Sequence, residues 1–327
     1  MLNTLNSPSE TSKAFVMKIT ELMQTMPIPH EDLDLWEKLY EDVEFYADTI
    51  GHKLHQSRAV AARKLDMQFF KEMNVYTNVQ RKEAQERGHK IISTRWLDVN
   101  KGDQAKPDYH SRLVGREINT HARLDLFAAT PPLESLRVIC SLCASNQRRR
   151  DPFVILSVDV KRAYFYAKST RPVYVEIPIE DYEPGDEHKV GKLNLSLYGT
   201  RDAAPNWCRE YYGFLEGIEF VKGKASPCNF VHASRELFLS VHGGGFTIIG
   251  PRNQVEWFKA KFQGKYEVKT TTLGMAEDLQ KEARVLNRTP RFTTTAVEYE
   301  HADLIIRDFW SSRRKTSRNA KDGREKS

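Results

Sequence analysis

The sequence predicts an α+β fold with an antiparallel sheet, preceded by a helical N-terminal extension. Apolar residues recur at helical spacing from residue 10 to residue 73, and from Val75 onward the chain changes to short strands, turns and interspersed helices. Two apolar runs, 236–241 and 246–249, flank three consecutive glycines in the pattern of a β-hairpin. Local hairpins favour an antiparallel sheet over a parallel one.

Three helices are predicted in the N-terminal part, over 15–26, 33–45 and 59–73. The first is ended by Pro27 and Pro29, since proline breaks a helix interior. His52 and His55 could share a helix face. Because no acidic or thiol ligand set accompanies them, we interpret them as solvated or core histidines, not metal ligands.

Further along, residues 90–99 are predicted as a strand closed by a turn at 100–103, and residues 133–144 as a helix. Residues 154–158 form a short apolar run typical of a buried strand, and residues 299–309 are predicted as a helix.

Composition excludes several classes of protein. The 327 residues are 40% hydrophobic and 29% charged, which is ordinary for a globular protein. No apolar run has the length of a membrane span, and the polar N-terminus lacks the order of a secretory signal, so we expect no membrane partner and an intracellular location, cytoplasmic or nuclear. Residues 311–327 carry seven basic and two acidic side chains and supply most of the net charge of +6, as a solvated tail would.

The four cysteines give no metal motif. Cys140 and Cys143 are close together in a helical stretch, but no second pair and no histidine cluster follows at ligand spacing. We therefore expect buried thiols.

The first residue with candidate chemistry is Asp159, at the end of the buried strand and just before a run of small and aromatic residues. A carboxylate at this position can hold Mg²⁺ while the following residues shape a pocket. Taken alone, the residue is better explained as a helix cap, which many aspartates are.

Asp159 lies within a series of ordered motifs. They are residues 109–117 (YHSRLVGRE), 127–137 (FAATPPLESLR), 157–167 (SVDVKRAYFYA), 173–178 (VYVEIP), 195–207 (LSLYGTRDAAPNW) and 226–230 (SPCNF). In this order and spacing they resemble the reverse transcriptase domain of copia-type LTR retrotransposon Pol polyproteins. The resemblance runs from roughly Ala62 to Phe309. It implies a right-hand polymerase fold, Mg²⁺ as cofactor, and an RNA template, a DNA primer and deoxynucleoside triphosphates as partners.

The resemblance also implies roles for single residues. Asp159 corresponds to the first metal-binding aspartate, and Tyr164 to the aromatic residue that closes over the sugar. Arg112 and Arg116 correspond to basic residues that grip the triphosphate, which a guanidinium fork suits. Gly199 lies where the backbone passes close to the template and nucleotide. Without the resemblance, either arginine could form a surface ion pair, and the tyrosine could simply pack in the core.

One motif departs from the family. The hairpin after residue 230 carries two consecutive aspartates in the family, whereas this chain has Gly244 and Gly245. Phosphoryl transfer by two metal ions needs several carboxylates, so we expect impaired catalysis. Glu236 lies too far along its strand to substitute, and Asp202 belongs to another segment.

The same glycines suggest a rival interpretation. The run from His242 to Phe246 (HGGGF) resembles the oxyanion-hole turn of some esterases, but the chain has no Gly-x-Ser-x-Gly nucleophile elbow, and only 82 residues follow Gly245. A hairpin turn explains the glycines better.

The predicted organisation is a helical extension (1–75), reverse transcriptase fingers and palm (76–275), the beginning of a thumb (276–310) and a disordered basic tail (311–327). Neither the paired His/Cys ligands of an integrase nor the further acidic sets of a ribonuclease H occur in the sequence. The alternative functions are a catalytically dead, nucleic-acid-binding relic of a transposon Pol protein, and a decaying gene product.

Overall fold

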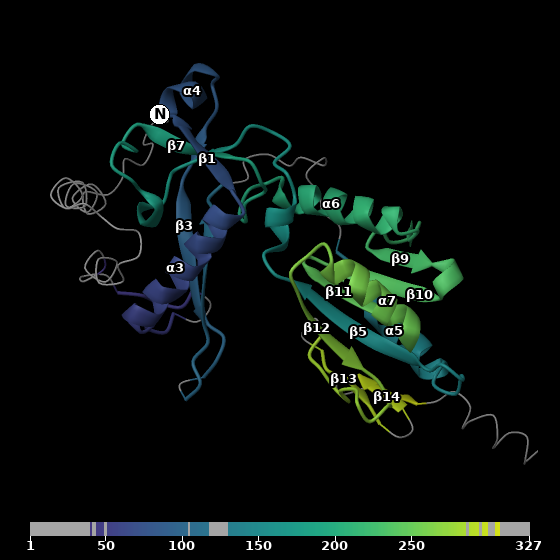
Figure 1. Cartoon of the computed structure of the whole chain (residues 1–327). Helices are drawn as coiled ribbons and strands as arrows, with labels where there is room; N and C mark the ends of the chain where they lie inside the picture. The colour runs from purple at the N-terminus through teal and green to yellow at the C-terminus, as the bar shows by residue number, and fades with distance from the viewer. Residues whose placement is uncertain are drawn as a thin grey trace, which may run out of the picture. The chain divides into compact units, whose positions relative to one another are not determined.

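The computed structural model of the chain describes residues 40, 44–48, 51–103, 105–117, 130–285, 288–293, 296–299 and 305–307. It divides into two units that interleave along the sequence (Figure 1). Unit 1 comprises Met1–Ala122 and Lys168–Ala203, and unit 2 comprises Arg123–Ala167 and Ala204–Ser327. The boundary predicted at residue 75 therefore falls inside unit 1. The predicted helix at 15–26, most of the predicted helix at 33–45 and the basic tail at 311–327 lie outside the described residues.

Unit 1 contains two small sheets and a long helix. The helix α3 (Gln56–Glu72) confirms the helix predicted at 59–73 and packs on β4, where the Leu113 amide donates a hydrogen bond to Asp66 at 3.1 Å. The strand predicted at 90–99 is divided into β2 (Ile91–Ile92) and β3 (Thr94–Asn100). The strand β3 pairs antiparallel with β4 (Tyr109–Gly115).

The other sheet of unit 1 has four strands in the order β1-β7-β6-β2. Its remaining members are β1 (Tyr76–Gln80), β6 (Tyr174–Val175) and β7 (Lys189–Leu193), and the short helices α4 (Arg81–Glu86) and η3 (Ile179–Asp181) lie in the same unit.

Unit 2 is built on a six-stranded antiparallel sheet with the order β12-β5-β11-β10-β9-β8. Its strands are β5 (Phe153–Val160), β8 (Val221–Lys222), β9 (Asn229–His232), β10 (Leu237–His242), β11 (Gly245–Pro251) and β12 (Val268–Leu273). The buried strand and the glycine hairpin predicted from the sequence are both confirmed, and so is the antiparallel sheet.

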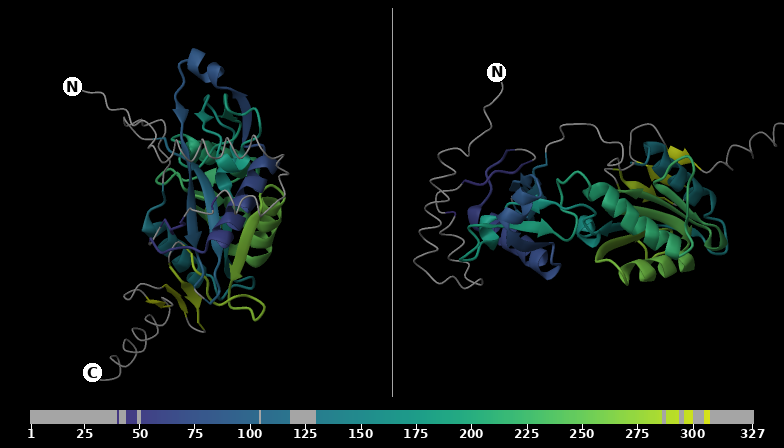
Figure 2. Two further views of the ribbon diagram at one scale, coloured as in Figure 1. Left: turned by 90° about the vertical axis from the view of Figure 1, so that its left-hand side faces the viewer. Right: turned by 90° about the horizontal axis from the view of Figure 1, so that it is seen from above.

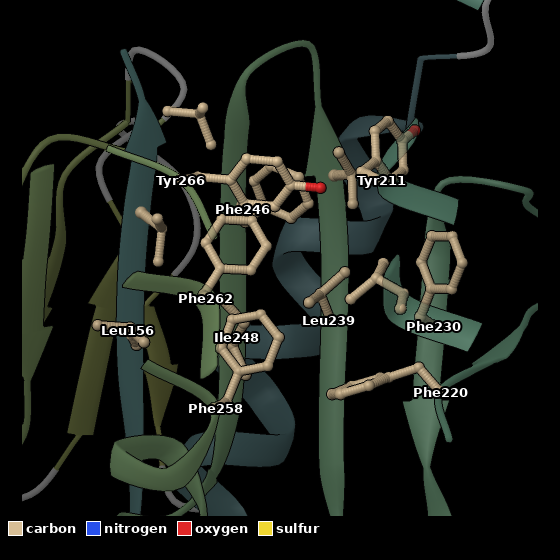
Figure 3. Packing of buried hydrophobic residues seen from close by; sticks show 14 of the residues in the cluster. Leu156, Tyr211, Phe220, Phe230, Leu239, Phe246, Ile248, Phe258, Phe262 and Tyr266 are labelled. Atoms are coloured by element: carbon tan, nitrogen blue, oxygen red, sulfur yellow. The ribbon is translucent and has the colours of Figure 1, made fainter. Parts of the chain in front are cut away.

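The central strand β5 is covered on both faces because its side chains alternate between two cores. Val154, Leu156 and Val158 pack with α6 (Ala203–Gly217) and α7 (Arg252–Gln263), in an aromatic-rich cluster that Figure 3 shows from close by. Phe153 and Ile155 pack instead with α5 (Leu133–Ser145), the helix predicted at 133–144. Figure 2 gives two further views of these layers.

The prediction of a helix at 299–309 is wrong for the residues of this range that the structure describes, 299 and 305–307, which are in strands. The chain there forms a three-stranded sheet of β13 (Pro290–Phe292), β14 (Ala296–Tyr299) and β15 (Ile305–Arg307). Ile306 pairs with Val297, which is buried in the core beneath α5. This pairing, together with the packing of Val297 against the core of α5, outweighs the local apolar spacing. The assignment of this region as a thumb stays a prediction.

Candidate functional site

The site in unit 2 centres on Asp159, which β5 delivers near its end with the side chain exposed. Its backbone partner on β11 is Gly245, and its partner on the other side, on β12, is Lys269. The next amide, that of Val160, donates a hydrogen bond of 2.9 Å to the carbonyl of Gly244. The glycine bend, at the start of β11, therefore lies directly beside Asp159 on the adjacent strand β5.

The bend itself is a two-residue turn at Gly243 and Gly244, between the paired residues His242 and Gly245. Only Gly243 has a positive φ, +59°, the region that favours glycine. A Cβ added at Gly244 would lie 3.2 Å from the Ala163 Cβ, and one at Gly245 would lie 3.3 Å from the His242 carbonyl oxygen. Shifts of a few tenths of an ångström would admit side chains at 244 and 245, so the backbone requires glycine only at 243.

A pocket of about 410 Å³ lies beside Asp159. It is lined by Ser157, Val158, Asp159, Gly245, Phe246, Thr247, Lys269, Thr271, Ala283, Arg284 and Val285. Asp159 carries the sole carboxylate among these lining residues. Two of the others, Lys269 and Arg284, are positively charged. In the part of the chain that the structure describes, no group of three or more His, Cys, Asp or Glu residues could hold a metal ion.

Both acids weighed as substitutes have ionic partners of their own. Glu236 pairs with Arg149 at 2.7 Å, and Asp202, in unit 1, pairs with Arg171 at 2.8 Å. A third acid, Glu267, comes directly before β12. It is two residues before Lys269, so both belong to the same face of the strand. Its Oε1 lies 2.5 Å from Lys161 Nζ. The sequence contains no signal for Lys269 or Glu267, because only the strand register brings them beside β5.

Tyr164 lies on η2 (Ala163–Tyr166), directly after β5. It is partly buried against the core that α6 and α7 cover, which agrees with the packing alternative. Its role over a sugar stays a prediction.

The other predicted residues belong to unit 1: Arg112 lies within β4, Arg116 directly follows it, and Gly199 packs against Gly115 at its end. The Arg112 guanidinium stacks over the Tyr198 ring, 4.4 Å from its centroid, and the Arg116 amide donates a hydrogen bond to the Ser93 carbonyl at 2.8 Å. Gly199 has φ of +80°, and a Cβ there would overlap the Gly115 carbonyl oxygen. The glycine requirement at 199 thus comes from close backbone packing within unit 1.

An ionic cluster next to this loop was not predicted from the sequence. Arg171 Nη2 lies 2.6 Å from Glu117 and 2.8 Å from Asp202, and the Arg201 amide also donates to Glu117 at 2.8 Å. The cluster ties Glu117, directly after Arg116, to the segment that follows Gly199.

Three of the four cysteines, Cys140, Cys143 and Cys228, are buried. Cys140 and Cys143 are buried under β5 and β11, and burial raises the pKa of the Cys140 thiol to about 12. The prediction of buried thiols is confirmed for these three cysteines, whereas Cys208 is only partly buried.

An antiparallel sheet that is covered by helices and presents an aspartate beside a hairpin bend is consistent with the palm of a template-directed polymerase. The family described as reverse transcriptase (RNA-dependent DNA polymerase) matches residues 73–280, and the chain belongs to this family. Over 215 residues it is 26% identical to the retrovirus-related Pol polyprotein from transposon TNT 1-94 of Nicotiana tabacum. The match covers 63% of this chain and 16% of that protein, so the chain spans only a small part of its relative. The predicted copia-type reverse transcriptase domain and its fold class are confirmed.

Among the solved structures that this chain matches is apo telomerase from Candida tropicalis truncated from its C-terminal domain, with a TM-score of 0.44, 9% identity, and coverage of 79% of this chain and 63% of that one. Foamy viral protease-reverse transcriptase in complex with double-stranded DNA gives a TM-score of 0.40 and 12% identity, covering 89% of this chain and 48% of that one. No helix among the described residues has the length and apolar character needed to cross a membrane.

Proposed function

We propose that this chain is a retrotransposon-derived reverse transcriptase domain whose palm lacks the carboxylates for two-metal catalysis. The observation that carries the proposal is the strand register: the residue opposite Asp159 on β11 is Gly245, and the preceding bend residue is Gly244. In the family that this chain resembles, these two positions hold aspartates.

The residues present do not fit a pair of Mg²⁺ ions. Two ions placed for an in-line displacement need several carboxylates to hold them. Asp159 is one, and the side chains of Ser157, Thr247 and Thr271 add only neutral hydroxyls to the pocket. Lys269, on the strand position opposite Asp159, adds a positive charge that opposes a second cation.

The expected loss of rate is large. Stabilisation of transition-state charge by a metal ion is worth several kcal/mol, so the loss of one ion slows turnover on the order of 10³-fold or more.

Binding of nucleic acid does not depend on the missing carboxylates. We infer that the chain binds an RNA template paired to a DNA primer, with Arg112 and Arg116 contacting phosphate, because a guanidinium retains its charge and fork geometry whatever happens at the palm. A binding relic without polymerase activity is therefore the second candidate function. Because its templates are nucleic acids of the cell interior, the location proposed is cytoplasmic or nuclear.

Primer extension on an RNA template with Mg²⁺ or Mn²⁺ tests the proposal. Four full-length proteins are compared: the chain as written, Gly244→Asp with Gly245→Asp, Gly244→Asn with Gly245→Asn, and the Asp double variant with Asp159→Asn added. The Asn pair is the matched control, because it adds the same volume without charge. We expect extension from the Asp double variant alone. Robust extension by the chain as written would overturn the claim of impairment.

Binding is tested separately by filter retention of a primer–template across a salt series. A phosphate-dominated complex loses affinity steeply as salt rises. A shortened chain ending at Trp310 controls for the basic tail. Binding that is absent, or independent of salt, would remove the second candidate function.

A further inference from the structure

The side chain of Trp207 reaches the glycine bend from α6. Its indole Nε1–H donates a hydrogen bond of 2.8 Å to the carbonyl of Gly243. The side chain is only 1% exposed, and a buried indole N–H without a partner carries a desolvation penalty. The bond to the bend therefore satisfies a polar group that has no access to water.

Neighbouring aromatic rings hold this indole in place. Its centroid lies 5.4 Å from that of Tyr211, 6.3 Å from Phe246 and 5.5 Å from Tyr266. Figure 3 shows Tyr211, Phe246 and Tyr266 gathered at one end of this core. Because Gly243 precedes and Phe246 follows positions 244 and 245, Trp207 contacts the bend on both sides of them.

The bend needs such an external anchor. Three consecutive glycines have no side chains that could pack and lose more backbone freedom on folding than any other residue. The bend is closed by the pairing of His242 with Gly245, and on the side of β5 Gly245 pairs with Asp159 and the Val160 amide donates a hydrogen bond to the Gly244 carbonyl. Trp207 therefore holds the first half of the bend and Val160 the second.

We propose that Trp207 is a positioning residue that fixes backbone positions 244 and 245 beside Asp159. The proposal rests on the proposed function in one respect: these are the positions at which the family's carboxylates are missing. It predicts that the bend keeps the geometry of a polymerase site although its charges have been lost.

Hydrogen–deuterium exchange on the full-length chain tests this directly. The reporters are the amide of Val160 and the amides of the hairpin from 241 to 246. Trp207→Phe removes the donor and keeps an aromatic ring. Benzothienylalanine at position 207 keeps the ring shape and removes only the N–H, so it serves if the smaller phenylalanine loosens the core. Loss of one hydrogen bond is expected to speed exchange at the reporters by roughly 3- to 10-fold.

Trp257→Phe is the matched control. Trp257 is a partly buried tryptophan of α7 in the same core, with the Arg235 guanidinium 3.8 Å from its ring centroid. We expect no change at the bend in this variant. Unchanged exchange in both position-207 variants, or equal acceleration in the control, would overturn the positioning role.

A second readout separates this proposal from the proposed function. In the Gly244→Asp, Gly245→Asp background, benzothienylalanine at 207 should lower kcat about tenfold and leave KM for the primer–template unchanged, as misplacement of reacting groups does. Suppose that the Asp double variant is inactive, while replacement of Trp207 still speeds exchange at the bend. The positioning role then stands, and the proposed restoration of activity fails. If the Asp double variant is active and insensitive to position 207, the positioning role fails alone.

Discussion

Replacement of Gly199 by alanine is the sharpest stability test that unit 1 offers. Gly199 lies in one of the motifs shared with reverse transcriptases, and its backbone has φ of +80°. An alanine Cβ would overlap the carbonyl oxygen of Gly115 and lie 3.1 Å from the carbonyl carbon. Since the obstacle is backbone and not the end of a flexible side chain, the two segments must separate.

The free-energy cost follows from two contributions. An L-residue at positive φ costs about 1–2 kcal/mol. Separation of the segments also weakens two backbone hydrogen bonds, from the Gly115 amide to the Tyr198 carbonyl at 2.7 Å and from the Glu117 amide to the Gly199 carbonyl at 3.3 Å. Each contributes about 1 kcal/mol. We therefore expect Gly199→Ala to lower the free energy of unfolding by about 3–4 kcal/mol.

The measurement is urea unfolding at 25 °C, followed by far-UV circular dichroism and by tryptophan fluorescence. Gly88→Ala is the matched control, because Gly88 is in the same unit with φ of +67° but has nothing within 4 Å of an added Cβ. It isolates the conformational cost, about 1–2 kcal/mol. The reasoning is refuted if Gly199→Ala destabilises the protein no more than Gly88→Ala does.

Three further predictions address other parts of the chain. Asp202→Asn removes an ionic partner of Arg171. Because the Asp202 side chain is only 4% exposed, the change should lower the free energy of unfolding by about 2–4 kcal/mol. An unchanged urea midpoint would contradict this. Burial raises the pKa of Cys140 to about 12, so its thiol stays protonated at pH 8. An aromatic disulfide should therefore react with Cys140 in the folded protein on the order of 10³-fold more slowly than with Cys140 in the urea-unfolded protein. Equal rates would contradict its burial. Arg112→Gln should reduce the slope of log affinity against log salt by about 1 for primer–template binding, and an unaltered slope would place Arg112 outside the phosphate contacts.

Local patterns in the sequence were sufficient for several elements of the fold. The helices at 59–73 and 133–144 and the glycine hairpin were predictable because periodicity and turn composition act over a few residues. The helix predicted at 299–309 failed for the opposite reason. Ile305 and Ile306 form a strand because they pair with β14, and Val297 of β14 is buried in a core shared with residues of α5, which lie far away in the sequence.

The residues of the candidate site also fall into two groups, those that the sequence could predict and those that it could not. The sequence already singled out Asp159 and the two glycines at 244 and 245, since each stands in a recognisable motif. It contained no signal that Lys269 lies opposite the aspartate, or that an indole from α6 holds the bend. Gly199 was predicted for its closeness to nucleotide and template, whereas the structure adds the carbonyl of Gly115 as a physical reason for glycine.

The sequence by itself determined which residue types are present: an aspartate at 159, glycines at 244 and 245, and the motifs that place the chain in its family. Only the tertiary structure decided which groups are neighbours, and thus that the glycine bend lies beside Asp159 with a lysine on the other side. The physical reason is that strand register depends on pairing and packing between segments far apart in the chain, and a shift of one residue would turn every side chain to the opposite face.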